Sequence, residues 1–112
     1  MSYPATNIRL LITHREADES TIILAEGLAA LPDFEVYMTR EGIASAVVER
    51  GVTYLPCPPI TGKVNLPVCR LLRRYVRQYH FTHTYSPGSS GLSNALLATL
   101  FSSVKNIAYR GT

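Results

Sequence analysis

The sequence predicts an α/β fold: a doubly wound, parallel sheet of about five strands with helices on both faces, in three layers. Short apolar or β-branched runs alternate along the chain with stretches that repeat apolar residues at helical spacing, as in βαβ units. The 112 residues are enough for one domain and leave little room for a second, so we expect a single domain over residues 1–112. Hydrophobic residues make up 46% and charged residues 17%, which excludes a disordered chain.

The first half of the chain supplies three predicted strands and two helices. Ile8–Thr13 is continuously apolar apart from Arg9 and its end, which is typical of a strand buried on both faces. The helix after it is capped by Asp18 or Ser20 and runs to about Leu31. A strand, a short helix and a strand follow, over Phe34–Thr39, Ile43–Arg50 and Val52–Leu55. Gly51 is placed to end the short helix.

The second half begins with a proline-rich loop over residues 56–62, because prolines do not join a central ladder. A long helix, a strand, a helix and a strand are then predicted, over 66–79, 81–85, 87–101 and 106–109. Since crossovers between parallel strands are right-handed, we expect the strand order 3-2-1-4-5, a Rossmann-like arrangement.

In that order the first and fourth strands are neighbours, and ligands of such sheets bind beyond the carboxyl ends of these two strands. The loop after the first strand carries His14, Arg15 and Glu16, which either contact a polar ligand or form a solvated capping segment. It has no glycine-rich phosphate motif, so we expect no nucleotide cofactor there. The segment Ser86–Gly91 is either an anion cradle at a helix start or an ordinary cap.

The fourth predicted strand is unusually polar for a central strand. It reads His-Phe-Thr-His-Thr-Tyr over residues 80–85, with Phe81, His83 and Tyr85 expected on one face. His83 is expected near the carboxyl end of the strand, where a side chain reaches the ligand crevice. Two roles stay open for it, a ligand contact and a structural hydrogen bond.

The helix over residues 66–79 carries two stripes. One is apolar, and the other is basic and consists of four arginines, Arg70, Arg73, Arg74 and Arg77. The arginines either bind an anionic membrane surface or phosphates, or are simply solvated while the apolar stripe packs on the sheet. We expect no nucleic-acid partner, because no binding motif accompanies the basic stripe.

Charge is divided unevenly along the chain. All eight acidic residues lie within the first 49 residues, which carry a net charge of −5, while the last 63 residues carry +8. This division favours an anionic partner for the second half, unless folding mixes the two halves on one surface. The two cysteines and three histidines show no metal-ligand spacing, so no metal site is expected.

The predicted location is the cytoplasm, or the inner face of a membrane as a peripheral protein. The cysteine count shows no disulfide framework, and no apolar run is long enough for a secretory signal or a membrane span. The exposed edge of the last predicted strand favours association of copies into a homo-oligomer.

Several segments together indicate a family. Ile8–Thr13, Ala25-Glu26-Gly27-Leu28 and Phe34–Thr39 resemble the opening of GT-B glycosyltransferases of the family 4 type. His83–Ser86 resembles the fourth strand of that family, and Tyr109–Thr112 resembles the segment after its fifth strand. The resemblance implies the N-terminal, acceptor-binding one of two Rossmann-like domains, with His83 at the cleft and Ser86 and Arg110 lining the same opening.

Two functions therefore stay open. In the first, the chain binds a glycan or lipid-linked acceptor for a glycosyltransferase whose missing C-terminal domain binds the nucleotide-sugar, and the chain alone is inactive. No residue is assigned a catalytic role, and no metal or other cofactor is expected. In the second, the chain is a stand-alone, flavodoxin-like module that binds an anionic small molecule or a protein.

Overall fold

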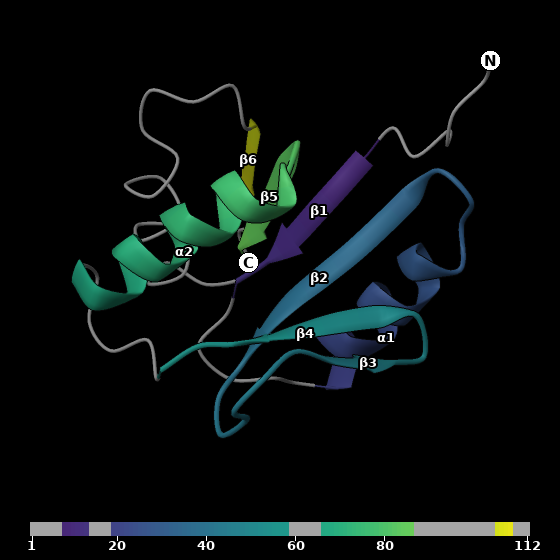
Figure 1. Cartoon of the computed structure of the whole chain (residues 1–112). Helices are drawn as coiled ribbons and strands as arrows, with labels where there is room; N and C mark the ends of the chain where they lie inside the picture. Colours follow the sequence, from purple (N-terminus) through teal and green to yellow (C-terminus); the bar gives the residue numbers. More distant parts are fainter. Residues whose placement is uncertain (1–7, 14–18, 59–65, 87–104, 109–112) are drawn as a thin grey trace, which may run out of the picture.

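The computed structural model describes residues 8–13, 19–58, 66–86 and 105–108. They form one mixed, mostly parallel sheet with two helices, so the predicted α/β class is confirmed (Figure 1). The sheet has six strands in the order β3-β4-β2-β1-β5-β6. Along the chain, the elements are β1 (Ile8–Ile12), α1 (Glu19–Ala29), β2 (Phe34–Arg40), β3 (Val47–Glu49), β4 (Val52–Pro56), α2 (Leu66–Tyr79), β5 (His83–Ser86) and β6 (Lys105–Ala108).

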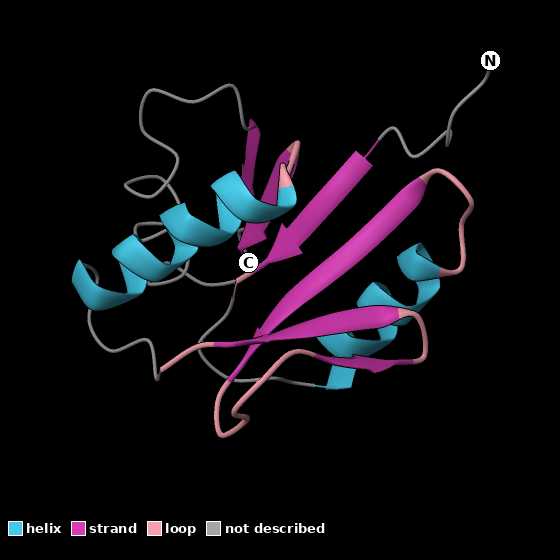
Figure 2. Cartoon of the chain, in the orientation of Figure 1, coloured by secondary structure: helices cyan, strands magenta, loops and turns pink. Residues whose placement is uncertain are grey.

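The two described helices pack on opposite faces of the sheet, because successive strand residues point to opposite sides. Leu10 and Ile12 of β1 belong to the apolar cluster that Ala25 of α1 joins. Leu11, between them, belongs to the cluster that Leu72 of α2 joins. In Figure 2, accordingly, α2 lies in front of the sheet and α1 behind it.

Most of the predicted elements are confirmed within one or two residues. The helix over residues 66–79 has the predicted bounds, and the first helix ends two residues early, at Ala29. The strands over residues 8–12 and 34–40 differ from prediction by one residue at one end, and the strand over residues 105–108 is shifted by one residue from the predicted 106–109. Pro56, assigned to the proline-rich loop, is instead the last residue of β4, and its carbonyl accepts a hydrogen bond from Tyr75 Oη at 2.6 Å. The helix predicted over 87–101 lies outside the described residues.

The predicted helix over Ile43–Arg50 is wrong. Val47–Glu49 is a strand, β3, that pairs antiparallel with β4. Arg50 and Gly51 both have positive φ, 50° and 83°, as the two central residues of a type I′ hairpin turn do. Gly51 is therefore a turn residue and not the end of a helix. The β-branched pair Val47-Val48 before this turn favours a strand over a short helix.

The strand β3 changes the sheet at one edge. The five strands near the predicted ranges keep their expected neighbours, but β3 lies outside β4, so the sheet has neither the predicted 3-2-1-4-5 order nor purely parallel strands. Glu49 of β3 also pairs with Arg40 of β2 at 3.1 Å, and the Arg40 guanidinium lies 3.7 Å from the centre of the Tyr54 ring. These contacts hold the added hairpin to the sheet.

The fourth predicted strand begins two residues later than expected. His80, at φ 55°, ends α2 in the left-handed conformation, and its N–H donates to the Val76 carbonyl at 3.0 Å. The chain therefore enters β5 only at His83. Phe81 packs in the cluster on the α2 side, whereas Tyr85 packs against the cluster on the α1 side. The predicted shared face for Phe81, His83 and Tyr85 is thus wrong.

Candidate functional site

Buried hydroxyl groups gather at the carboxyl end of the central strands. Thr13 follows β1, and its N–H donates to the Tyr85 carbonyl of β5 at 2.9 Å. Thr39 lies on β2 one residue beyond Met38, which pairs with Ile12. Strand alternation places both threonines on the face that α2 covers, and Thr84 of β5 faces the same way. All three threonines are buried, so the described end of β1, β2 and β5 presents hydroxyls where an apolar layer is expected.

Thr39 is the exceptional member of this group. Its Oγ1 is buried and has no hydrogen-bond partner. Leaving a buried hydroxyl unsatisfied costs about 1–3 kcal/mol, so such a group in a native fold calls for a specific explanation. A ligand or water bound at the carboxyl end of β2 would satisfy it.

Replacing Thr39 by valine is expected to leave the fold intact and to raise the free energy of unfolding of the ligand-free chain by about 1 kcal/mol, because the unsatisfied hydroxyl is removed at nearly constant volume. Thr82→Val is the matched control. Thr82 Oγ1 accepts a hydrogen bond from the Arg9 N–H at 2.9 Å, so its loss should destabilise the chain by a similar amount. Urea unfolding measures both, and destabilisation by Thr39→Val would show that its hydroxyl has a partner in the free protein.

Cys57 lies just beyond β4, and its N–H donates to the Arg40 carbonyl at 3.1 Å. Burial, with a smaller contribution from the Glu41 carboxylate, raises the pKa of the Cys57 thiol from 9.0 to about 11. The thiol therefore stays protonated at neutral pH, and the protonated form is a poor nucleophile.

This pKa also predicts how stability depends on pH. Below pH 9 the Cys57 thiol is protonated in both the folded and the unfolded chain, and its contribution to the free energy of unfolding is complete. Above that value the unfolded chain loses the proton first, so the free energy of unfolding falls by up to about 1.4 kcal/mol per pH unit. Urea unfolding at pH 8, 9 and 10 should show this decline, and Cys57→Ala should flatten it. A slope that survives the substitution would assign it to another group.

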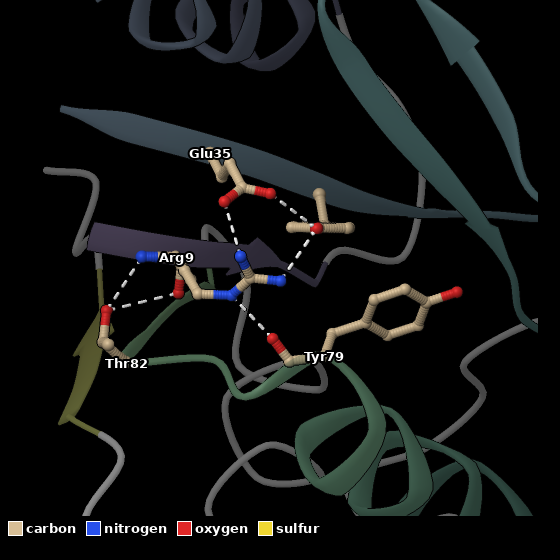
Figure 3. Close-up of polar contacts among 5 residues, drawn as sticks. Arg9, Glu35, Tyr79 and Thr82 are labelled. Carbon is tan, nitrogen blue, oxygen red and sulfur yellow. Dashed lines mark hydrogen bonds and ion pairs between the residues drawn. The ribbon is translucent and has the colours of Figure 1, made fainter. Parts of the chain in front are cut away.

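A polar cluster lies at the opposite, amino end of the sheet (Figure 3). The Arg9 guanidinium contacts Glu35 at 2.5 Å, Tyr37 Oη at 3.0 Å and the Tyr79 carbonyl at 2.7 Å. Tyr37 Oη in turn donates to Glu35 at 2.9 Å. Burial, together with the hydrogen bond to Glu35, raises the pKa of Tyr37.

This amino-end cluster is structural, because it ties β1 and β2 to the last residue of α2. A cation at the end of α2 also compensates the helix dipole. The site prediction did not include Arg9. The signal was the lone arginine inside the apolar run of the first strand, which burial makes costly unless it is paired.

His83 does not lie where it was expected. It opens β5 and pairs in register with Leu10, so it sits away from the carboxyl end of the strand. Its Nδ1 lies 2.8 Å from Thr82 Oγ1, which supplies the structural hydrogen bond left open as one of its two roles. His83 also lines an apolar pocket beside α1.

The arginines of α2 lie as predicted on an exposed stripe. Arg70, Arg73, Arg74 and Arg77 are all exposed, whereas Val68, Leu72 and Tyr75 on the other side are buried in the core. Among the described residues, none of the four takes part in an ion pair; the three pairs found join Arg9, Arg40 and Arg50 to carboxylates of the first half. Folding therefore leaves this stripe unneutralised by described carboxylates.

The other predicted site residues are not brought together here. His14, Arg15, Glu16 and Arg110 lie outside the described residues, as does the segment 87–91. Ser86 is described in its backbone and pairs with Ala108 of β6. In the described part of the chain, no group of three or more histidine, cysteine or acidic residues could hold a metal ion.

None of the described helices is long and apolar enough to cross a membrane. Comparison of the chain with protein-family models, curated proteins and solved structures gives no match.

Proposed function

We propose that this chain is an α/β binding domain that takes a glycan at the carboxyl end of β1, β2 and β5, as the acceptor-side, Rossmann-like domain of a glycosyltransferase. The observation that carries the proposal is the buried hydroxyl of Thr39, which lacks a partner at this end of the sheet. In α/β sheets of this kind the carboxyl end is where ligands bind.

The polarity of the site favours a neutral, hydroxyl-rich ligand over a phosphate. The buried groups at this end, on Thr13, Thr39 and Thr84, are hydroxyls, and the unsatisfied one on Thr39 can exchange a hydrogen bond with a sugar hydroxyl without desolvating a charge. Arg40, the described cation nearest to Thr39 in sequence, is already engaged by Glu49 and the Tyr54 ring. A sugar hydroxyl would therefore find a partner in Thr39, whereas a phosphate would find no available described cation.

Calorimetric titration with maltose, as a neutral glycan probe, tests the proposal. We expect saturable binding to the wild type and binding about 3- to 12-fold weaker to Thr39→Val, the effect of one net hydrogen bond. Thr82→Val, at the other end of the sheet, should bind maltose as the wild type does. No binding of maltose, or equal affinities for the wild type and Thr39→Val, would contradict the proposed site.

Inorganic phosphate separates the two candidate functions. The glycosyltransferase proposal gives the free chain no phosphate site, because the nucleotide-sugar binds to the other domain, and it expects no sugar transfer by the chain alone. Saturable phosphate binding without saturable maltose binding would favour the stand-alone module.

The arginine stripe of α2 supports a second proposal: an anionic membrane surface as the partner that brings the domain to a lipid-linked acceptor. Exposed Leu66 lies on the same side of α2 as Arg70 and Arg77, which adds an apolar contact that a nucleic-acid phosphate would not use. Since the apolar side of α2 is buried in the core, the contact is mainly electrostatic, with Leu66 adding to it, and does not involve insertion of the helix.

Co-sedimentation with vesicles that contain phosphatidylserine tests the membrane proposal. Each arginine near such a surface contributes about 1 kcal/mol, so replacing Arg70, Arg73, Arg74 and Arg77 together by glutamine should abolish binding at low salt. Raising the salt should weaken binding of the wild type. Binding that survives the fourfold substitution, or that phosphatidylcholine vesicles match, would overturn the proposal.

A further inference from the structure

A pocket of about 260 Å³ lies on the α1 side of the sheet, the face opposite to that of the three buried threonines. Ile8, Leu10 and Phe34 from β1 and β2 form one part of its wall, and Leu24 and Leu28 of α1 form another. His83 and Tyr85 of β5 complete it. Seven residues from β1, α1, β2 and β5 thus line this hollow.

The single imidazole in this wall is held in place. His83 Nδ1 lies 2.8 Å from Thr82 Oγ1, and that oxygen accepts the Arg9 N–H at 2.9 Å. The ring is thus tied to the backbone of β1 by two successive hydrogen bonds. Its other nitrogen, Nε2, has no hydrogen-bond partner among the described residues. His83 and Tyr85 are the lining residues whose side chains carry polar atoms, and the other five are hydrocarbon side chains.

We propose that this pocket binds a small, apolar, ring-containing compound that carries one hydroxyl, with the apolar part against Leu24, Leu28 and Phe34 and the hydroxyl on His83. An apolar cavity of about 150 Å³ takes benzene, so by proportion this pocket has room for about two fused rings. Apolar pockets with a few placed polar groups are the usual form of small-molecule sites. The site lies on the other face of the sheet from the three threonines and does not depend on the proposed glycan function.

Titration of the methyl-labelled full chain with 2-naphthol tests the proposal. We expect saturable shifts of the methyl signals of Ile8, Leu10, Leu24 and Leu28 in the wild type. Leu28→Phe places a larger side chain in the pocket and should weaken binding by at least about 5-fold. Ile23→Phe is the matched control, because Ile23 is exposed on the same helix and does not line the pocket. Its affinity should equal that of the wild type.

The hydroxyl contact is tested with naphthalene, which has the rings of 2-naphthol without its hydroxyl. The wild type should bind 2-naphthol about 3- to 12-fold more tightly than naphthalene, and His83→Phe should remove this preference. The methyl shifts of the wild type show whether 2-naphthol binds in the pocket even where a variant fails to fold. Absence of saturable shifts at these four residues, or an unchanged preference in His83→Phe, would overturn the proposal.

Discussion

Leu72→Ala is expected to lower the free energy of unfolding by about 2–5 kcal/mol, the range for removing a large aliphatic side chain from a core. Leu72 is only 1% exposed and lies in the cluster that joins α2 to the sheet, with Leu11, Tyr37 and Leu55 as members. The truncation removes the apolar contacts between α2 and the sheet and leaves a cavity in this cluster. In a chain of 112 residues, a loss of this size is a large share of the total stability.

Leu66→Ala is the matched control for this substitution. Leu66 is on the same helix but is 62% exposed, so the same chemical change should cost less than about 0.5 kcal/mol. Urea unfolding followed by circular dichroism measures both variants. Equal losses for the two would mean that α2 does not pack on the sheet through Leu72.

Arg9→Met is expected to cost about 2–3 kcal/mol. The substitution keeps much of the apolar stem but removes a guanidinium that serves Glu35, Tyr37 and the Tyr79 carbonyl. Hydrogen bonds to charged groups contribute about 1.5–3 kcal/mol each when buried. The expected loss is smaller than the sum of three such bonds, because the side chains of Arg9 and Glu35 are 27% and 41% exposed and solvent screens the pair.

The pairing of Arg9 with Glu35 is isolated by a double-mutant cycle with Glu35→Gln. We expect a coupling of about 1 kcal/mol, since the two side chains are in direct contact. Arg73→Met is the control for loss of an arginine. Arg73 is exposed on α2 and has no ion pair in the described part of the chain, so its loss should be nearly neutral. A coupling near zero would show that the ion pair between Arg9 and Glu35 does not stabilise the fold.

Elements with a single, strong local signal were predicted well. The helix over residues 66–79 follows directly from its two stripes, because an apolar side at helical spacing has to be buried and the arginines opposite have to face outward. The first strand likewise follows from its apolar run over residues 8–12. These features depend on local sequence, which is why no tertiary information was needed.

The hairpin at β3 was missed because two local signals compete. A glycine after a polar residue suits both the end of a helix and the second position of a type I′ turn. The choice is made by pairing with β4, since Glu49 lies opposite Val52 across the turn. A contact with a partner strand is invisible in a short window of sequence, although the β-branched Val47-Val48 was a usable sign.

Thr39 was missed as a candidate site residue for a similar reason. The topology predicts ligand binding at the carboxyl end of the sheet, but the importance of Thr39 depends on whether its hydroxyl has a partner, which is a property of the folded environment. His83 lies nearer the start of its strand than expected, because His80 ends α2 with positive φ and β5 begins only at His83. Asparagine, aspartate and histidine adopt this conformation more readily than most residues, so His80 carried a sign of the boundary.

The backbone chemical shifts of the full chain during a titration with maltose test the central claim most directly. If a glycan binds at the carboxyl end of β1, β2 and β5, the amide signals of Thr13, Thr39 and Thr84 should shift with one saturation curve, while that of Glu35 at the opposite end should stay fixed. Thr39→Val should move the curve to higher maltose concentrations. Saturable shifts confined to residues away from the three threonines, or no shifts at all, would contradict the claim.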